Sequence, residues 1–88
     1  MTARFLEVTY RNGTAMAAYL HLPRVAGAKV HRTAEMAPGL LVDFDSRGSP
    51  IGVEITAPSK VGVAAVNAVL ERLGVARLRP REWSPLAA

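Results

Sequence analysis

The side chains best suited to chemistry are three carboxylates on a short alternating stretch, Asp43, Asp45 and Glu54. Carboxylate oxygens on one face of a hairpin could bind a hard cation, but such a cation needs about six oxygen ligands. No Asn or Gln lies between these acids to supply more. The competing interpretation is a solvated sheet face on which Asp45 closes its own turn through an Asx bond. We favour the solvated face, and a bound cation stays an open alternative.

Two histidines, His21 and His31, are the other residues that could act as a base or ligate a metal. Their spacing matches no HxH or HExxH pattern, and neither a GxSxG elbow nor a GxxxxGK[ST] phosphate loop is present. Cysteine is absent, which excludes thiolate chemistry and disulfides. The sequence therefore predicts no catalytic, cofactor or metal site, and we expect a protein that is not an enzyme.

Basic residues gather in the last part of the sequence, near the single tryptophan, Trp83. The arginines concerned are Arg72, Arg77, Arg79 and Arg81. Arginines interleaved with aromatic rings can bind single-stranded nucleic acid by charge and stacking. One aromatic residue gives little stacking, and Glu71 and Glu82 dilute the charge. A tail that docks on protein is therefore favoured over one that binds nucleic acid.

The composition is typical of one small globular domain. The chain has 88 residues, half of them apolar and a fifth charged, with a net charge of +4. A domain of this size without disulfides is marginally stable, so we expect self-association. No signal peptide is visible, and no apolar stretch approaches the roughly 20 residues that span a membrane. With cysteine absent, we expect a cytoplasmic protein that has no membrane partner.

The first part of the chain predicts two strands, residues 5–10 and 14–22, joined by a tight turn. The dipeptide Asn12-Gly13 favours a type I′ turn, because both residues tolerate positive φ. The resulting pairing places Tyr10 opposite Ala15, Val8 opposite Ala17 and Leu6 opposite Tyr19. The second face then carries Phe5, Met16, Ala18 and Leu20. We expect the helix or a second subunit to cover that face.

Residues 28–36 predict an edge strand, because polar side chains occupy both of its faces. A second hairpin follows over residues 39–55, and its apolar sets meet in only one register. That register places Leu40 opposite Ile55, Val42 opposite Val53 and Phe44 opposite Ile51. Gly52 within a strand indicates that the helix or a partner backbone approaches closely.

Residues 60–73 predict a helix, with Ser59 as its N-cap, Gly74 at its C-terminal end and Asn67 on its solvated side. Prolines break the tail, residues 75–88. We expect apolar residues to anchor the tail on its own or a neighbouring subunit, with the arginines at the rim. The anchors are Leu78, Trp83 and Leu86.

Together these elements predict one α+β domain. Residues 1–59 form an antiparallel β-meander of four or five strands. One C-terminal helix, residues 60–74, packs on one face of this sheet, and the proline-broken basic tail follows.

Residues of these strands also carry a resemblance to a known family. They are Tyr10, Tyr19-Leu20, Thr33-x-Glu35, Gly39, Val42-Asp43-Phe44-Asp45, Gly48, Gly52-Val53-Glu54-Ile55, and Ala57 with Ser59. In this pattern the chain resembles, over about residues 5–59, the short bacterial proteins filed as domain of unknown function 2283. The chain departs from the family at Arg11, where members usually have Asp, and at the following turn, where they often have further acids.

The resemblance implies a small α+β fold and self-association, and it assigns no activity. Toxin-like genes said to neighbour some members suggest an antitoxin-like role. The leading hypothesis is a non-enzymatic, homo-oligomeric protein-interaction module, an antitoxin-like regulator of a partner protein. Its candidate partner-binding residues are Phe5, Met16, Leu20, Leu78, Trp83 and Leu86. The alternative is a small-ligand or nucleic-acid binding protein that uses the arginine-rich tail.

Overall fold

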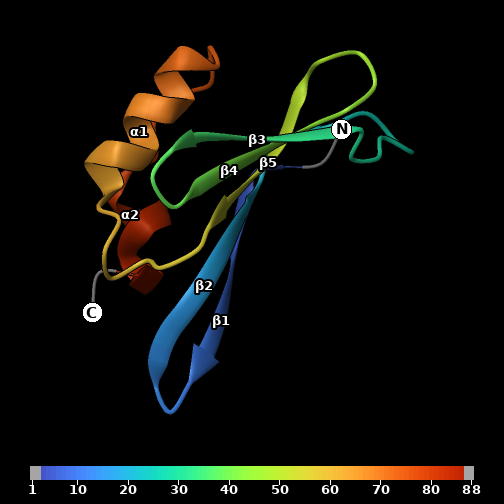
Figure 1. Cartoon of the computed structure of the whole chain (residues 1–88). Helices are drawn as coiled ribbons and strands as arrows, with labels where there is room; N and C mark the ends of the chain where they lie inside the picture. Colours follow the sequence, from blue (N-terminus) through green and yellow to red (C-terminus); the bar gives the residue numbers. More distant parts are fainter. Residues whose placement is uncertain (1–2, 87–88) are drawn as a thin grey trace.

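The structure is a computed structural model that describes residues 3–86, and this part of the chain folds into one sheet and two helices (Figure 1). The strands are β1 (Phe5–Arg11), β2 (Thr14–His21), β3 (Arg32–Ala37), β4 (Leu40–Phe44) and β5 (Pro50–Ile55). The helices are α1 (Val63–Arg72) and α2 (Pro80–Trp83), followed by a 3₁₀ turn, η1 (Ser84–Leu86). The predicted α+β fold, an antiparallel sheet with a C-terminal helix, is confirmed. Residues 1–2 of the predicted sheet segment and 87–88 of the predicted tail lie outside the described residues.

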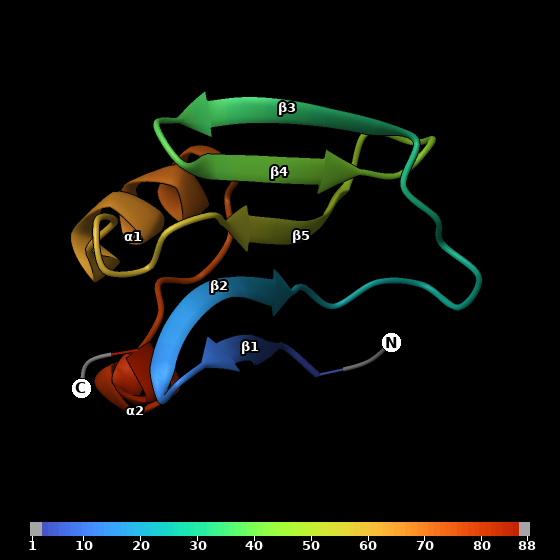
Figure 2. The same cartoon turned by 60° about the horizontal axis from the view of Figure 1, so that its bottom comes forward.

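The strand order departs from a continuous meander at one connection. The strands lie in the order β1-β2-β5-β4-β3, and all neighbours are antiparallel. After β2 the chain passes along the end of the sheet through residues 22–31 and adds β3 at the far edge (Figure 2). β5 therefore lies next to β2, and in this central position its apolar residues Val53 and Ile55 are fully buried. The predicted edge strand is confirmed, although it begins at Arg32.

The second hairpin has the predicted register over most of its length. Leu40 pairs with Ile55 and Val42 with Val53. The predicted pairing of Phe44 with Ile51 is wrong, because the register shifts after Asp43 and Phe44 pairs with Pro50. The extra residue is Ile51, a bulge that no periodicity in the sequence indicates.

The first hairpin contains a second bulge, which corrects its predicted faces. Asn12 and Gly13 have φ of 52° and 76°, so the predicted turn is confirmed, as is the pairing of Tyr10 with Ala15. Beyond that pair the register shifts by one residue, and Met16 is the extra residue. The observed pairs are Val8 with Ala18 and Leu6 with Leu20, not the predicted Val8 with Ala17 and Leu6 with Tyr19. Leu20 therefore faces the core, and Phe5 lies on the other face of the sheet.

Helix α1 begins later than predicted, because the chain first makes a separate turn after β5. Its N-cap is Gly62, with no side-chain cap, so the predicted Ser59 cap is wrong. The C-terminal end is as predicted, since Gly74 has a φ of 72° and the Val75 N–H donates to the Leu70 carbonyl at 2.9 Å, as in a Schellman motif. Among residues 3–86 no helix has the length and apolar character needed to cross a membrane.

One hydrophobic core lies between the sheet and the helical segments. Its buried members are Ala18, Leu20, Leu22, Leu40, Val42, Phe44, Val53, Ile55, Val61, Val66, Val69, Leu70 and Leu78. Trp83 and Leu86 are partly buried and pack against this core. Residues 75–86 therefore dock on their own domain, and the three arginines of this segment are exposed, as is Arg72 at the end of α1.

A buried hydrogen bond joins α1 to this docked segment. The Leu78 N–H donates to Asn67 Oδ1 at 2.7 Å, and both residues are buried. The predicted exposure of Asn67 is wrong, because the segment after Gly74 folds back over that side of the helix. At the other end of the segment, Arg4 donates to both carboxylate oxygens of Glu82 at 3.0 Å.

Replacing Asn67 tests this connection. Asn67→Ala leaves the Leu78 N–H buried without an acceptor, so we expect the free energy of unfolding to fall by about 1–3 kcal/mol. Glu71→Ala on the same helix removes only an exposed ion pair with Arg77 and should cost less than about 1 kcal/mol. Urea unfolding followed by the fluorescence of Trp83 measures both losses. Equal losses would show that the Asn67 bond contributes nothing specific.

Candidate functional site

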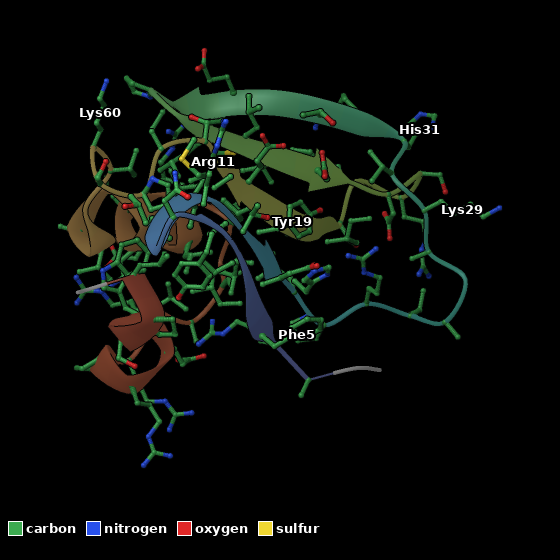
Figure 3. The ribbon with its side chains drawn as sticks, turned by 90° about the horizontal axis from the view of Figure 1, so that it is seen from below. Phe5, Arg11, Tyr19, Lys29, His31 and Lys60 are labelled. Atoms are coloured by element: carbon green, nitrogen blue, oxygen red, sulfur yellow. The ribbon has the colours of Figure 1, made fainter. Side chains whose placement is uncertain are left out.

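The sheet has one face that the helices do not cover, because α1 and α2 both lie on the other side (Figures 1 and 2). Strand pairing arranges the residues of this open face in two rows that cross all five strands from β1 to β3. The first row is Glu7, Tyr19, Glu54, Leu41 and Glu35, and the second is Phe5, His21, Gly52, Asp43 and Thr33. We call these ten residues the open face. Figure 3 shows Phe5 on β1 and Tyr19 on β2.

A hydrogen-bonded link crosses the centre of the open face. The Tyr19 hydroxyl donates to Asp43 Oδ2 at 2.7 Å, and the Thr33 hydroxyl donates to Asp43 Oδ1 at 2.5 Å. Gly52 lies beneath the tyrosine, since a Cβ built on it would sit 1.8 Å from the Tyr19 hydroxyl oxygen. The predicted close approach at Gly52 thus exists, but the approaching group is a tyrosine side chain and not the helix or a partner backbone.

The environment of Tyr19 keeps its phenol protonated. Burial is the largest cause, and with the hydrogen bond to Asp43 and the charge of that carboxylate it raises the pKa of Tyr19 from 10.0 to about 12. Arg24 acts in the opposite direction and does not offset these effects. At neutral pH Tyr19 is therefore a hydrogen-bond donor, and its hydroxyl is not a nucleophile.

Beside this link, three side chains form a small aromatic cluster around His21. Its ring stacks on Phe5, with centroids 4.3 Å apart and an interplanar angle of 10°, and meets the edge of Tyr19 at 4.7 Å. His21 Nε2 lies 2.8 Å from Glu7 Oε1. The cluster gives the β1 end of the open face an apolar, aromatic surface with an acidic rim.

The three carboxylates singled out in the sequence do not meet. Asp45 is buried, and its Oδ1 accepts the N–H groups of Arg47 at 2.9 Å and Ser49 at 3.0 Å, which is the favoured Asx turn. Asp43 and Glu54 lie in different rows of the open face. In residues 3–86 no group of three His, Cys, Asp or Glu side chains is placed to hold a metal ion.

The predicted partner-binding residues separate into two groups. Leu20 and Leu78 are 1% and 5% exposed and belong to the core, so they are not available to a partner. Trp83 and Leu86 pack against the same core. Phe5 and Met16 are 53% and 47% exposed.

Tyr19 was missed as a residue of the open face because the bulge at Met16 decides which face each β2 residue takes. Leu41, on β4, was not among the predicted partner-binding residues either. The signal available in the sequence was Gly52, a residue without a side chain in the middle of a strand.

The arginines of the alternative hypothesis are exposed but largely engaged with their own chain. Arg72 donates to the Met36 carbonyl at 2.9 Å, Arg77 Nε lies 2.9 Å from Glu71 Oε1, and Arg79 Nε lies 3.6 Å from Glu82 Oε1. A hollow of about 460 Å³ lies beside them; its lining residues are Val63, Asn67, Arg77, Leu78, Pro80 and Trp83. Because Trp83 packs on the core and is partly buried, only part of its ring surface is free for stacking on a base.

A double-mutant cycle tests the link across Gly52. Gly52→Ala forces the Tyr19 ring away from Asp43, so we expect the free energy of unfolding to fall by about 1–3 kcal/mol. In a Tyr19→Ala background the same change meets no ring and should cost much less. Denaturant unfolding of the four proteins gives the coupling energy. An unchanged cost of Gly52→Ala in both backgrounds would contradict the contact.

The raised pKa of Tyr19 predicts a fall in stability at alkaline pH. The folded protein holds this proton more tightly than the unfolded chain, so the stabilising contribution is complete below pH 10 and is lost as pH rises towards 12. Ultraviolet absorbance of tyrosinate, compared with that of Tyr19→Phe, should show a group titrating at about 12. A titration of Tyr19 at its ordinary value would contradict the prediction.

Comparison with known proteins identifies one related family. No curated protein and no solved structure matches the chain. One family model does match part of the chain. The matched segment covers β3, β4, β5 and most of β2, and it includes Tyr19, Thr33, Asp43 and Gly52. The resemblance inferred from the sequence is thus confirmed over this segment: residues 17–58 match a family described as protein of unknown function (DUF2283).

Proposed function

We propose that the protein is a non-enzymatic protein-interaction module that associates with itself and binds a basic surface of a partner protein on its open face. The observation that carries this proposal is the segregation of charge. The open face contains Glu7, Glu35, Asp43 and Glu54, and the cations beside it are Arg11 at the end of β1 and Arg24 near Tyr19, although the chain has a net charge of +4. A carboxylate surface of this kind favours basic partners and repels acidic ones.

Apolar groups between these acids give a partner something to bury. Phe5 is 53% exposed at the β1 end, and Leu41 lies half-buried between Glu54 and Glu35. Apolar contacts ringed by charged groups are typical of protein interfaces, where burial supplies affinity and the charged rim supplies selectivity. The partner surface that fits is one with basic side chains around an apolar contact.

Two features support a binding role over a catalytic one. The Tyr19 hydroxyl is held protonated, and both carboxylate oxygens of Asp43 already accept hydrogen bonds. Nucleophilic catalysis requires a nucleophile with a base in reach. Neither serine nor cysteine is among the ten residues of this face, and its one aliphatic hydroxyl, that of Thr33, donates to the Asp43 carboxylate.

The same charges argue against self-association through two open faces. Such a contact would place Glu7, Glu35 and Glu54 of one copy against those of another, and like charges in a closed interface are costly. Self-association therefore uses a different surface, which leaves the open face free for the partner. An antitoxin-like regulator is the form of this function that the family resemblance suggests.

Affinity capture from cells of the native host tests the proposal. We expect the wild-type protein to retain a partner that Glu54→Arg, a change in the middle of the open face, no longer retains. Glu71→Arg is the matched control, since it makes the same charge change at an exposed position of α1. A partner bound equally by all three proteins would overturn the assignment to the open face. Retention that instead depends on Arg79 and Arg81 and falls steeply with salt would favour nucleic-acid binding.

A further inference from the structure

The outer edge of β1 is an unpaired strand edge. β1 pairs with β2 on one side only, and residues 3–86 make no other backbone hydrogen bond to it. Its sequence, FLEVTYR, is rich in β-forming residues, has no proline or lysine, and carries one charge of each sign. Natural proteins protect such edges, because a row of free N–H and C=O groups invites pairing with another strand.

The opposite edge of the sheet, β3, shows the protection that β1 lacks. The register of β3 shifts between Glu35 and Ala37, and Pro38 follows directly. A bulge and a proline both disfavour the addition of a strand. In the first hairpin the extra residue is Met16 on β2, so the backbone of β1 itself stays regular.

The turn of the first hairpin determines which groups β1 presents outward. A two-residue type I′ turn makes Arg11 and Thr14 a hydrogen-bonded pair, so Arg11 directs its backbone groups towards β2. Backbone direction alternates along a strand, so the N–H and C=O groups of Leu6, Val8 and Tyr10 point away from β2 and are free to pair.

We propose that β1 pairs in antiparallel fashion with β1 of a second copy of this chain, about a two-fold axis at Thr9. In this register Glu7 of each copy lies opposite Arg11 of the other, and the two ion pairs are symmetric. Val8 of each copy lies opposite Tyr10 of the other on the reverse side. A register centred on Val8 leaves Glu7 opposite Thr9, so charge complementarity selects the axis at Thr9 and a second copy as the occupant.

This pairing specifies the self-association within the proposed function and leaves the open face uncovered. The two sheets become one continuous sheet, and the two open faces lie side by side on the same side of it. One dimer would then present two acidic faces to a partner, and simultaneous engagement of both would raise the apparent affinity.

A single cysteine tests the register directly, because the chain has no cysteine of its own. Facing residues of a non-hydrogen-bonded antiparallel pair have Cα atoms about 4.5 Å apart, within the range that a disulfide bridges. We expect Thr9→Cys to form a disulfide-linked dimer on mild oxidation. Thr33→Cys, exposed on the other edge strand, is the control and should stay monomeric. Cross-linking of Thr9→Cys no greater than that of Thr33→Cys would overturn the proposal.

Charge exchange tests the two ion pairs without a cross-link. Arg11→Glu places like charges opposite each other, so we expect the dimer dissociation constant to rise about tenfold or more in sedimentation experiments. The double variant Glu7→Arg with Arg11→Glu restores opposite charges and should restore the dimer. A wild-type monomer throughout, or a double variant no better than Arg11→Glu, contradicts the pairing.

The outcomes also separate this inference from the proposed function. If the dimer tests fail while Glu54→Arg still abolishes partner capture, only the β1 pairing is wrong. If the dimer forms but no partner depends on the open face, the partner-binding proposal is wrong and the pairing stands.

Discussion

The burial of β5 in the centre of the sheet is the constraint on which the rest of this fold depends. Val53 and Ile55 have no exposed surface, and each burial of such a side chain contributes about 1.5–3 kcal/mol. With one face of β5 packed under α1, its pairing with β2 and β4 is fixed, because a slip by one residue would move the apolar set to the open face. The second hairpin and the attachment of β2 to the rest of the sheet both depend on this one strand.

Once β5 is fixed, its opposite side becomes the open face. Gly52 and Glu54 alternate with the buried residues, and the empty space above Gly52 admits the ring of Tyr19. That ring reaches across β5 to Asp43 on β4 and so ties the first hairpin to the second. The core and the open face therefore share one physical origin, the alternation of side chains along a single central strand.

Charge is divided between the two sides of the molecule. Carboxylates dominate the open face, with Arg11 and Arg24 beside it, whereas the arginines of α1 and of residues 75–86 lie on the helical side, where Glu71 and Glu82 pair with Arg77 and Arg79. The open face suits a basic partner, and the β1 edge suits a strand of matching sequence. Because the face and the edge are different surfaces, the proposed pairing of β1 would leave the open face free for the proposed partner.

The sequence by itself determined the local features of this protein. Alternation and turn residues predicted the strands, the turn at Asn12-Gly13 and most of the second hairpin, and periodicity predicted α1 with its end at Gly74. These features depend on neighbours in the chain. The candidate site was predicted less well: Phe5 and Asp43 were named, but their association with Tyr19 was not.

The tertiary structure alone decided the bulges at Met16 and Ile51, the place of β5 beside β2, and the burial of Asn67 and Leu20. Each of these depends on contacts between segments far apart in the chain. A bulge leaves no periodic signal, yet it exchanges the two faces of every residue beyond it. The residues that gather on the open face were therefore determined by long-range packing, which the order of residues in one strand does not contain.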